Sequence, residues 1–249
     1  MRCYNKVSFA HRGYFSKDCF IPENSMPAFH EAVKHGYGIE LDVHLTKDQK
    51  LVVFHDDTLT RMCGLDKTIE QSTLAELRAL HLQNTPEKIP LFSEVLHYVN
   101  GRVPLLIEIK LPTNDTSICH YVHEELRHYS GPLLIQSFNT LVLYWFRRHA
   151  SHFLRGQLSS NLTKKKEKTS YILRFMVRFL LLNFYGKPDF ISYKLKDTDN
   201  LSLGINQYLY KIPVAVWTLR NEKDYEYGKH NYNMTIFERF PNRGMGTKR

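Results

Sequence analysis

Short runs of almost purely apolar residues alternate along the chain with longer stretches in which apolar residues recur every three or four positions. The apolar runs are typical of strands buried on both faces of a parallel sheet, and the periodic stretches are typical of amphipathic helices. This pattern predicts strands at residues 7–11, 38–45, 51–55, 104–110, 133–137, 153–158, 189–193, 214–219 and 234–240. It predicts helices at residues 24–36, 73–80, 92–99, 116–129, 141–149 and 203–210.

Strand and helix therefore alternate in close to eight units, which favours a parallel sheet closed into a barrel over an open sheet. The length of 249 residues also fits one such barrel. We predict an α/β fold, a (β/α)8 TIM barrel, as a single domain over residues 1–249. Two segments interrupt the regular order: a short insertion after the second strand and a basic, apolar insertion after the fifth strand, at about residues 160–187.

Composition and charge narrow the functional classes. The net charge is +9, but residues 164–187 hold seven Lys or Arg against Glu167 alone, which accounts for +6 of that total. The remainder is only mildly basic, so we expect no nucleic-acid partner. The four cysteines are widely spaced and indicate neither a zinc site nor a disulfide framework. The chain starts without an apolar leader and has no long uncharged apolar segment, so we expect a cytoplasmic location.

Three acidic residues interrupt the apolar runs near strand ends. Glu40 and Asp42 lie two apart in the second strand, and Glu108 lies near the end of the strand at 104–110. Residues two apart share one face of a strand, and the carboxyl ends of barrel strands carry the active site, so the three side chains can converge on one ion. Crowded carboxylates without cysteine favour Mg²⁺ or Ca²⁺. For either the pair Glu40 and Asp42 or the pair Glu108 and Lys110 alone, ordinary salt bridges are the better explanation, but the whole set at matching strand ends favours a site.

Two histidines each end a predicted strand. His11 closes the first strand, and His55 closes the short strand that follows the acidic pair. Imidazole exchanges a proton near neutral pH, so these two side chains are the natural acid–base pair for the site. Trp217, near the end of the seventh strand, is either the apolar wall of a ligand pocket or an ordinary core residue.

Six segments, which together include these acids and histidines, resemble bacterial glycerophosphodiester phosphodiesterases in order and spacing. The segments are His11-Arg12-Gly13, Pro22-Glu23-Asn24-Ser25, Glu40-Leu41-Asp42-Val43, Val52-Val53-Phe54-His55-Asp56, Leu59-x-Arg61 and Glu108-Ile109-Lys110. The resemblance is dense over the first 110 residues and thins afterwards to short matches at 136–138, 191–193, 216–218 and 237–238.

The resemblance implies a phosphodiesterase barrel that releases an alcohol and glycerol 3-phosphate from glycerophosphodiesters. The roles that it implies are metal binding by Glu40, Asp42 and Glu108, general acid–base catalysis by His11 and His55, and phosphate contact by Arg12 and Lys110. We assign His55 to the leaving group, and the attacking group is either water or the glycerol hydroxyl of the substrate. Two alternatives stay open: a phospholipase-D-like barrel acting on lysophospholipid or sphingolipid, and a catalytically silent barrel that binds a phosphorylated ligand.

The insertion after the fifth strand joins a lysine-rich run at 164–168 to an apolar stretch in which Arg174 and Arg178 lie one helical turn apart. Such a helix is too interrupted to span a bilayer but suits a membrane surface or a lid over the site. We expect residues 164–182 to make peripheral contact with the anionic inner face of a membrane. A helix packed on the barrel, with a solvated lysine run, is the alternative.

Overall fold

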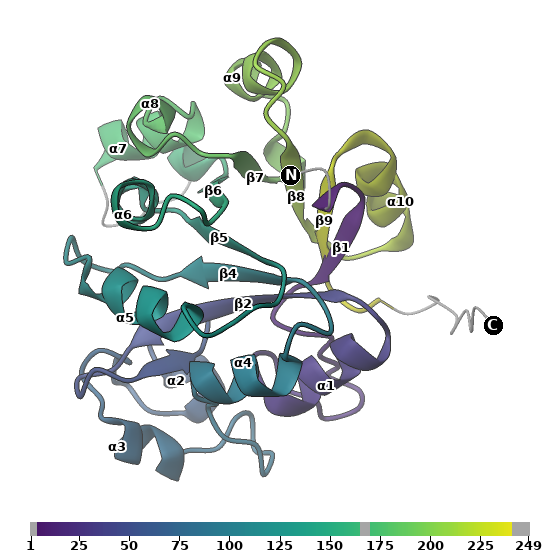
Figure 1. Ribbon diagram of the computed structural model, residues 1–249. Coiled ribbons are helices and arrows are strands. Elements are labelled where there is room, and N and C mark those ends of the chain that lie inside the picture. Colours follow the sequence, from purple (N-terminus) through teal and green to yellow (C-terminus); the bar gives the residue numbers. More distant parts are fainter. Residues whose placement is uncertain (1–3, 165–169, 241–249) are drawn as a thin grey trace.

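Eight parallel strands form a closed ring at the centre of the molecule (Figure 1). The computed structural model describes residues 4–164 and 170–240. The ring consists of β1 Val7–Ala10, β2 Gly38–Leu45, β4 Leu105–Ile109, β5 Leu133–Ser137, β6 Arg155–Ser159, β7 Phe190–Lys194, β8 Val214–Leu219 and β9 Met234–Phe237. Neighbours in this order pair with each other, and the pairing of β9 with β1 closes the ring. The predicted TIM barrel is confirmed.

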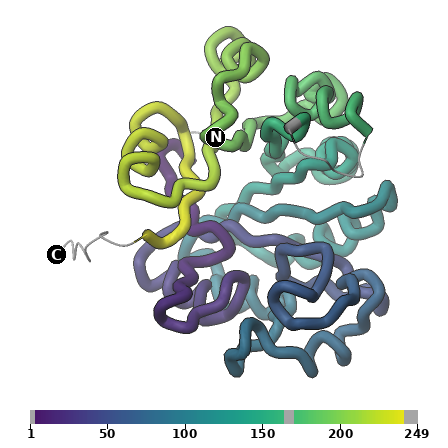
Figure 2. Tube along the Cα trace, turned by 180° about the vertical axis from the view of Figure 1, so that it is seen from behind, coloured from purple at the N-terminus to yellow at the C-terminus, as the bar shows by residue number. Residues whose placement is uncertain are grey.

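Helices connect the strands and lie around the outside of the ring (Figures 1 and 2). They are α1 Met26–Lys34, α2 Thr60–Cys63, α3 Leu74–Ala79, α4 Phe92–Val99, α5 Ser117–Leu126, α6 Thr140–His149, α7 Tyr171–Arg178, α8 Asn183–Gly186, α9 Leu201–Gly204 and α10 Glu222–Asn231. The helix predicted at 203–210 is instead the short α9, continued by a wider turn over Ile205–Leu209, and α9 projects from the molecule in both views. Helix α10 has no counterpart among the predicted helices.

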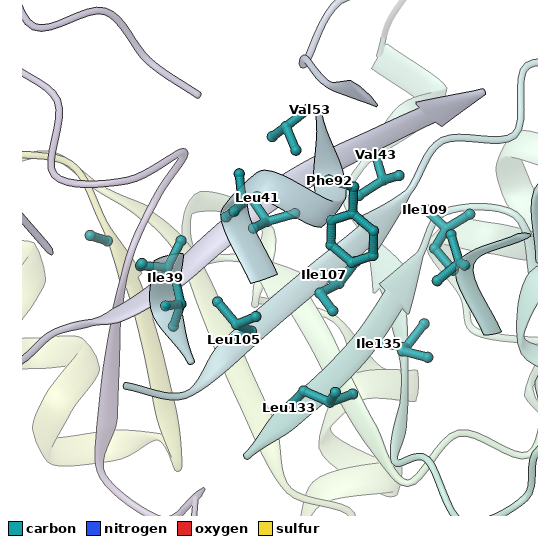
Figure 3. Close-up of a cluster of buried hydrophobic side chains, with 14 of the residues drawn as sticks. Ile39, Leu41, Val43, Val53, Phe92, Leu105, Ile107, Ile109, Leu133 and Ile135 are labelled. Atoms are coloured by element: carbon teal, nitrogen blue, oxygen red, sulfur yellow. The ribbon is translucent and has the colours of Figure 1, made fainter. Parts of the chain in front are cut away.

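The outward-pointing residues of the strands form the main core, between the ring and its helices. Aliphatic side chains of β2, β4 and β5 pack there against Phe92 of α4 (Figure 3). These side chains occupy every second position of their strands, as in Leu105, Ile107 and Ile109. The residues between them must therefore point into the ring.

The inward-pointing residues fill the ring with apolar side chains near the amino ends of the strands. Phe9, Leu106, Leu134 and Phe190 belong to this inner cluster. Gly156 makes room for it, because a Cβ atom at that position would lie 2.2 Å from the Phe190 ring. Polar inward positions remain only towards the carboxyl ends of the strands, and the candidate site lies there.

The insertion after β2 spans residues 46–91 and carries β3 (Leu51–Val53), α2 and α3. Strand β3 pairs antiparallel with β2 outside the ring. The segment has its own small core, made of Val52, Phe54, Leu59, Met62, Ile69, Leu77, Leu82 and Ile89. This core anchors the loop after β3, which carries His55.

The insertion after β6 contributes α7 and α8, which lie beside α6 (Figure 1). The Ser159 hydroxyl donates to the Val177 carbonyl oxygen at 2.8 Å, and the Tyr193 hydroxyl donates to that of Arg178 at 2.8 Å. Tyr185 of α8 stacks on Tyr144 of α6 with ring centroids 4.1 Å apart. Residues 165–168 of the lysine-rich run lie outside the described residues. Across 4–164 and 170–240, none of the helices has the length and apolar character needed to traverse a bilayer.

Candidate active site

Three buried carboxylates meet inside the ring, near the carboxyl ends of β2 and β4. Asp42 lies opposite Glu108 in the strand register, and Glu40 precedes Asp42 by two residues on the same face. Carboxylate oxygens of Glu40, Asp42 and Glu108 lie within 4.8 Å of one another. The structure therefore brings together the three residues that were predicted as metal ligands.

Neighbouring elements hold these acids in place. The main-chain N–H of Arg12 donates to Glu40 at 3.0 Å. The Lys110 ammonium bridges Asp42 and Glu108, at 2.9 Å and 2.6 Å. The positive charge of Lys110 therefore already lies among the three carboxylates. Lys110 can reach Glu108 because residues two apart on an extended chain point to the same side.

Burial and mutual repulsion oppose the ionisation of this cluster. Burial, together with the charges of Asp42 and Glu108, raises the pKa of Glu40 well above its usual value. Burial also disfavours the charge of Asp42, but the Lys110 ammonium and other nearby positive groups lower its pKa far below the usual range. Burial raises the pKa of Glu108 even though Lys110 opposes the shift. The full carboxylate set therefore needs a further positive charge to ionise.

Two amide side chains place additional oxygen atoms beside the acids. Gln136 donates its side-chain N–H to Glu40 at 3.3 Å, and Asn24 donates to Asp42 at 2.9 Å. The carbonyl oxygens of both amides are buried and accept no hydrogen bond within the described part of the chain. Hard divalent cations and the water molecules that they carry prefer an oxygen-rich surrounding of this kind. The residues present therefore fit the Mg²⁺ or Ca²⁺ predicted from the sequence.

Each of the two candidate histidines is held at Nδ1 by a carboxylate. His11 Nδ1 lies 3.1 Å from Glu238 Oε1, and Glu238 accepts two hydrogen bonds from Arg220, at 2.7 and 2.8 Å. His55 Nδ1 lies 2.6 Å from Asp56 Oδ1. Burial lowers the pKa of His11, and the hydrogen bond to Glu238 opposes this shift. Burial alone would raise the pKa of Glu238, but the bonds from His11 and Arg220 lower it to about 2.

A chain of ion pairs joins the second histidine to the acids. Arg61 donates to Asp56 at 2.6 Å and to Glu23 at 2.6 Å, and Arg12 donates to Glu23 at 2.6 Å. No role was predicted from the sequence for Glu23, Asp56, Arg61 or Glu238. A signal was present, because all four stand in the short segments that resemble the phosphodiesterases, and Asp56 directly follows His55.

A cavity of about 790 Å³ opens over the acids, and every predicted site residue except the more deeply buried Asp42 lines it. Trp217 lies edge-on to Phe138, with ring centroids 5.8 Å apart. His11, Glu40, Glu108 and Lys110 line the cavity at the carboxyl ends of the strands, and Arg174 of α7 lines it as well. The lining towards the insertion is mainly apolar and includes Leu141, Leu158, Leu162, Leu173, Val177 and Leu182. The cavity can thus hold a phosphate at one end and an apolar group at the other.

The chain is similar to known proteins in sequence and in fold. The model of the "Glycerophosphoryl diester phosphodiesterase family" matches residues 11–249. A glycerophosphodiester phosphodiesterase of Bacillus altitudinis is 35% identical over 159 residues, which cover 58% of this chain and 62% of that protein. A lysophospholipase D of Rattus norvegicus is 30% identical over 188 residues, which cover 70% of this chain and 52% of that protein. The chain therefore spans little more than half of the length of these curated relatives.

The fold has close counterparts among solved structures. A phosphodiesterase of Oleispira antarctica, in complex with the product sn-glycerol-3-phosphate, superposes with a TM-score of 0.76. The superposition covers 95% of this chain and 94% of that one, at 21% sequence identity. The barrel and its order of elements are thus common to both proteins.

Proposed function

Since the chain belongs to the glycerophosphoryl diester phosphodiesterase family, we propose that it is a metal-dependent enzyme that hydrolyses glycerophosphodiesters to an alcohol and glycerol 3-phosphate. One observation carries the proposal: three buried carboxylates within 4.8 Å of one another share a cavity with two histidines. Each histidine is oriented by its own carboxylate. We take residues 1–249 as one barrel domain that holds the whole site.

In this proposal Glu40, Asp42 and Glu108 hold one divalent cation, Mg²⁺ or Ca²⁺. Their oxygens lie close enough to share an ion, and the buried carbonyl oxygen of Gln136 lies next to them. When bound, such a cation offsets negative charge on the phosphodiester oxygens. The fit of the oxygen-rich donor set supports this part of the proposal.

Two basic side chains bind the phosphate. Arg12 lines the cavity directly beside the acids, and it is oriented by Glu23 at 2.6 Å. Lys110 lines the same end of the cavity. Cations fixed in a partly desolvated site stabilise the charge that develops on phosphate oxygens in the transition state. Trp217 forms the apolar wall against which the glycerol or the alcohol part packs.

The two imidazoles transfer the protons of the reaction. One accepts a proton from the attacking group, which is water or the glycerol hydroxyl of the substrate, and the other, which we assign as His55, donates a proton to the oxygen of the departing alcohol. The bond between phosphorus and that oxygen breaks as the new phosphorus–oxygen bond forms. Attack by the glycerol hydroxyl gives a cyclic phosphate, which water then opens to glycerol 3-phosphate. Glu238 and Asp56 act through these rings as positioning residues, because each occupies Nδ1 and leaves Nε2 for the substrate.

The central test is metal dependence. Purified enzyme is incubated with glycerophosphocholine, and release of glycerol 3-phosphate is measured with and without excess chelator. We expect chelation to abolish release and added Mg²⁺ or Ca²⁺ to restore it. Full activity in excess chelator would contradict the role given to the three acids.

The apolar end of the cavity supports a second candidate function, hydrolysis of lysophospholipids. This apolar surface suits an acyl chain, and a water-soluble head group does not need it. It is formed by Leu158, Leu173, Val177 and Leu182. Choline release from lysophosphatidylcholine, compared with glycerol 3-phosphate release from glycerophosphocholine, distinguishes the two substrates. If neither substrate is cleaved while a phosphorylated ligand still binds, the barrel is a catalytically silent binding protein.

The proposal also covers the substrate, a membrane contact and the cellular location. The substrate is a small glycerophosphodiester, and residues 164–182 make peripheral contact with an anionic membrane. A cytoplasmic location, at the inner face of that membrane, remains part of the proposal. The net charge of +6 in residues 164–187 supports the membrane contact.

A further inference from the structure

Many apolar side chains in and around α7 and α8 are exposed to solvent. Of the fifteen large hydrophobic side chains that are exposed in the described residues, seven lie between residues 171 and 185. Ile172 is 70% exposed, Tyr171 60% and Phe184 74%. A soluble helix normally turns such residues towards the core, and contiguous exposed apolar surface marks a contact site.

Arg174 and Arg178 of α7 point away from this exposed surface. Arg174 is half-buried and lines the cavity, while Arg178 is half-buried and donates to the Thr163 hydroxyl at 3.0 Å. The inner side of α7 therefore combines two arginines with the buried Val177, while its outer side is apolar. The outer side leaves apolar area in contact with water, and a further surface that covered Ile172 and Phe175 would remove this area from water.

A lipid bilayer fits this requirement better than a protein partner. The face consists of protruding aliphatic and aromatic residues on two short helices, a composition that is typical of segments lying in a membrane interface. Without the two inward-turned arginines, residues 164–187 hold five lysines against Glu167, a net charge of +4, and Lys187 is exposed beside α8. Anionic lipid head groups complement this charge, and each nearby basic residue strengthens such binding.

We propose that the outward face of α7 and α8 docks on the surface of an anionic phospholipid bilayer. We call it the rim face and define it by Tyr171, Ile172, Phe175, Leu181 and Phe184. The inner side of the same two helices lines the cavity through Leu173, Val177 and Leu182. Docking therefore places the mouth of the cavity at the lipid surface, where products of lipid breakdown are released. This consequence for substrate supply rests on the proposed hydrolysis of glycerophosphodiesters, whereas the docking is argued from the exposed side chains and is tested without that activity.

Vesicle binding of the full chain tests the proposal. Co-sedimentation is measured with vesicles of phosphatidylcholine alone and with vesicles of equal parts phosphatidylcholine and phosphatidylglycerol. We expect the wild type to bind the anionic vesicles at least tenfold more tightly than the neutral ones. The double variant Ile172→Ser, Phe184→Ser loses two apolar anchors and should bind the anionic vesicles about tenfold or more weakly. Neither residue lines the cavity, so hydrolysis of glycerophosphocholine should stay unchanged.

A matched control uses the exposed residues of α9 and the turn after it. Leu201 and Tyr208 are 79% and 78% exposed but lie outside the rim face, so the double variant Leu201→Ser, Tyr208→Ser should retain vesicle binding.

Equal losses of vesicle binding by both double variants, or no vesicle binding by the wild type, would overturn the proposal. A wild-type dimer that the rim-face variant converts to a monomer in light scattering would also overturn it, in favour of a second copy as the occupant. A wild-type protein that binds anionic vesicles but does not hydrolyse glycerophosphocholine would contradict the proposed function and leave the docking supported.

Discussion

Both candidate histidines have the same local arrangement although they come from different parts of the chain. His11 contacts Glu238 through Nδ1, and His55 contacts Asp56 through Nδ1. A carboxylate at Nδ1 fixes the ring orientation and the tautomer, so Nε2 is the nitrogen that exchanges a proton with the substrate. His11 is nearly buried, whereas 31% of the His55 side chain is exposed. The more accessible ring is the better placed one for a departing alcohol.

Alanine substitution tests the paired histidines. We expect His11→Ala and His55→Ala each to lower kcat for glycerophosphocholine by about 10²- to 10⁴-fold, because each removes one proton-transfer group. Both variants should keep the far-ultraviolet circular dichroism spectrum of the wild type. His97→Ala on the exposed side of α4 is the matched control and should keep full activity. Near-normal turnover by either active-site variant would refute its role.

Glu238 offers a sharper test of positioning. Glu238→Gln keeps an oxygen that can accept from His11 but removes the charge that stabilises the protonated ring. Burial already lowers the pKa of His11, and Glu238 opposes that shift, so the variant should lower the pKa further. We expect kcat to fall on the order of 10- to 100-fold with little change in KM, and the limb of the pH–rate profile that reports His11 to move to lower pH. Glu222→Gln in the exposed first turn of α10 should leave the profile unchanged.

At the scale of elements, the interior of the ring depends on close contacts between neighbouring strands. Gly156 of β6 lies against the Phe190 ring of β7, its partner in the strand register. A methyl group there would have to displace an aromatic side chain that is fully buried. The inner cluster that supports the acids from below therefore tolerates no larger residue at this position.

Paired glycine substitutions measure this constraint. We expect Gly156→Ala to lower the free energy of unfolding by about 1–3 kcal/mol or more, because overpacking forces the phenyl ring or the strand to move. Gly204→Ala in α9 meets no atom within 4 Å and keeps a helical backbone, so it should be neutral or should stabilise the protein by about 0.4–1 kcal/mol. Thermal unfolding of both variants checks the difference. Equal melting temperatures would show that the Phe190 contact is not limiting.

The elements that the sequence predicts well are those with a strong apolar signal. Strands β2 and β4 are apolar except for the acids and His44, so both their position and the facing of Glu40, Asp42 and Glu108 follow from alternation. Helix α10 was not predicted because only Tyr225 and Gly228 of its ten residues are buried, which leaves no apolar period to detect. For α7, spacing indicates a helix, but spacing cannot tell which side of it faces water.

At the scale of the whole molecule, closure of the ring creates contacts that no local pattern contains. His11 and Glu238 are 227 residues apart, and they meet because β9 pairs with β1. Glu23, Asp56 and Arg61 meet because the loops after β1 and β3 reach the same rim. The sequence predicts which residues belong to the site, but the partners that orient them depend on the closed barrel.

The acid cluster should make the whole molecule less stable when no cation is bound. Burial and repulsion by Asp42 and Glu108 both destabilise a negative charge on Glu40. The variant Glu40→Gln removes this charge and keeps the shape of the side chain. The Oε1 atom of Gln136, which has no hydrogen-bond partner in the described residues, can accept from the new amide group. We expect the free energy of unfolding of the metal-free variant to exceed that of the metal-free wild type by about 0.5–2 kcal/mol. Its melting temperature should be a few degrees higher.

The opposite should hold when a divalent cation is present. A cation at about 100 times its dissociation constant adds roughly 2.7 kcal/mol to the stability of the wild type, because it binds only the folded ring. The Glu40→Gln variant, which lacks one of the three ligands, should gain little under the same conditions. Differential scanning calorimetry in chelator and in Mg²⁺ or Ca²⁺ measures both effects, with Glu31→Gln on α1 as the control. A wild-type melting temperature that does not respond to either ion, or a variant that responds equally, would show that these acids are structural rather than a cation site.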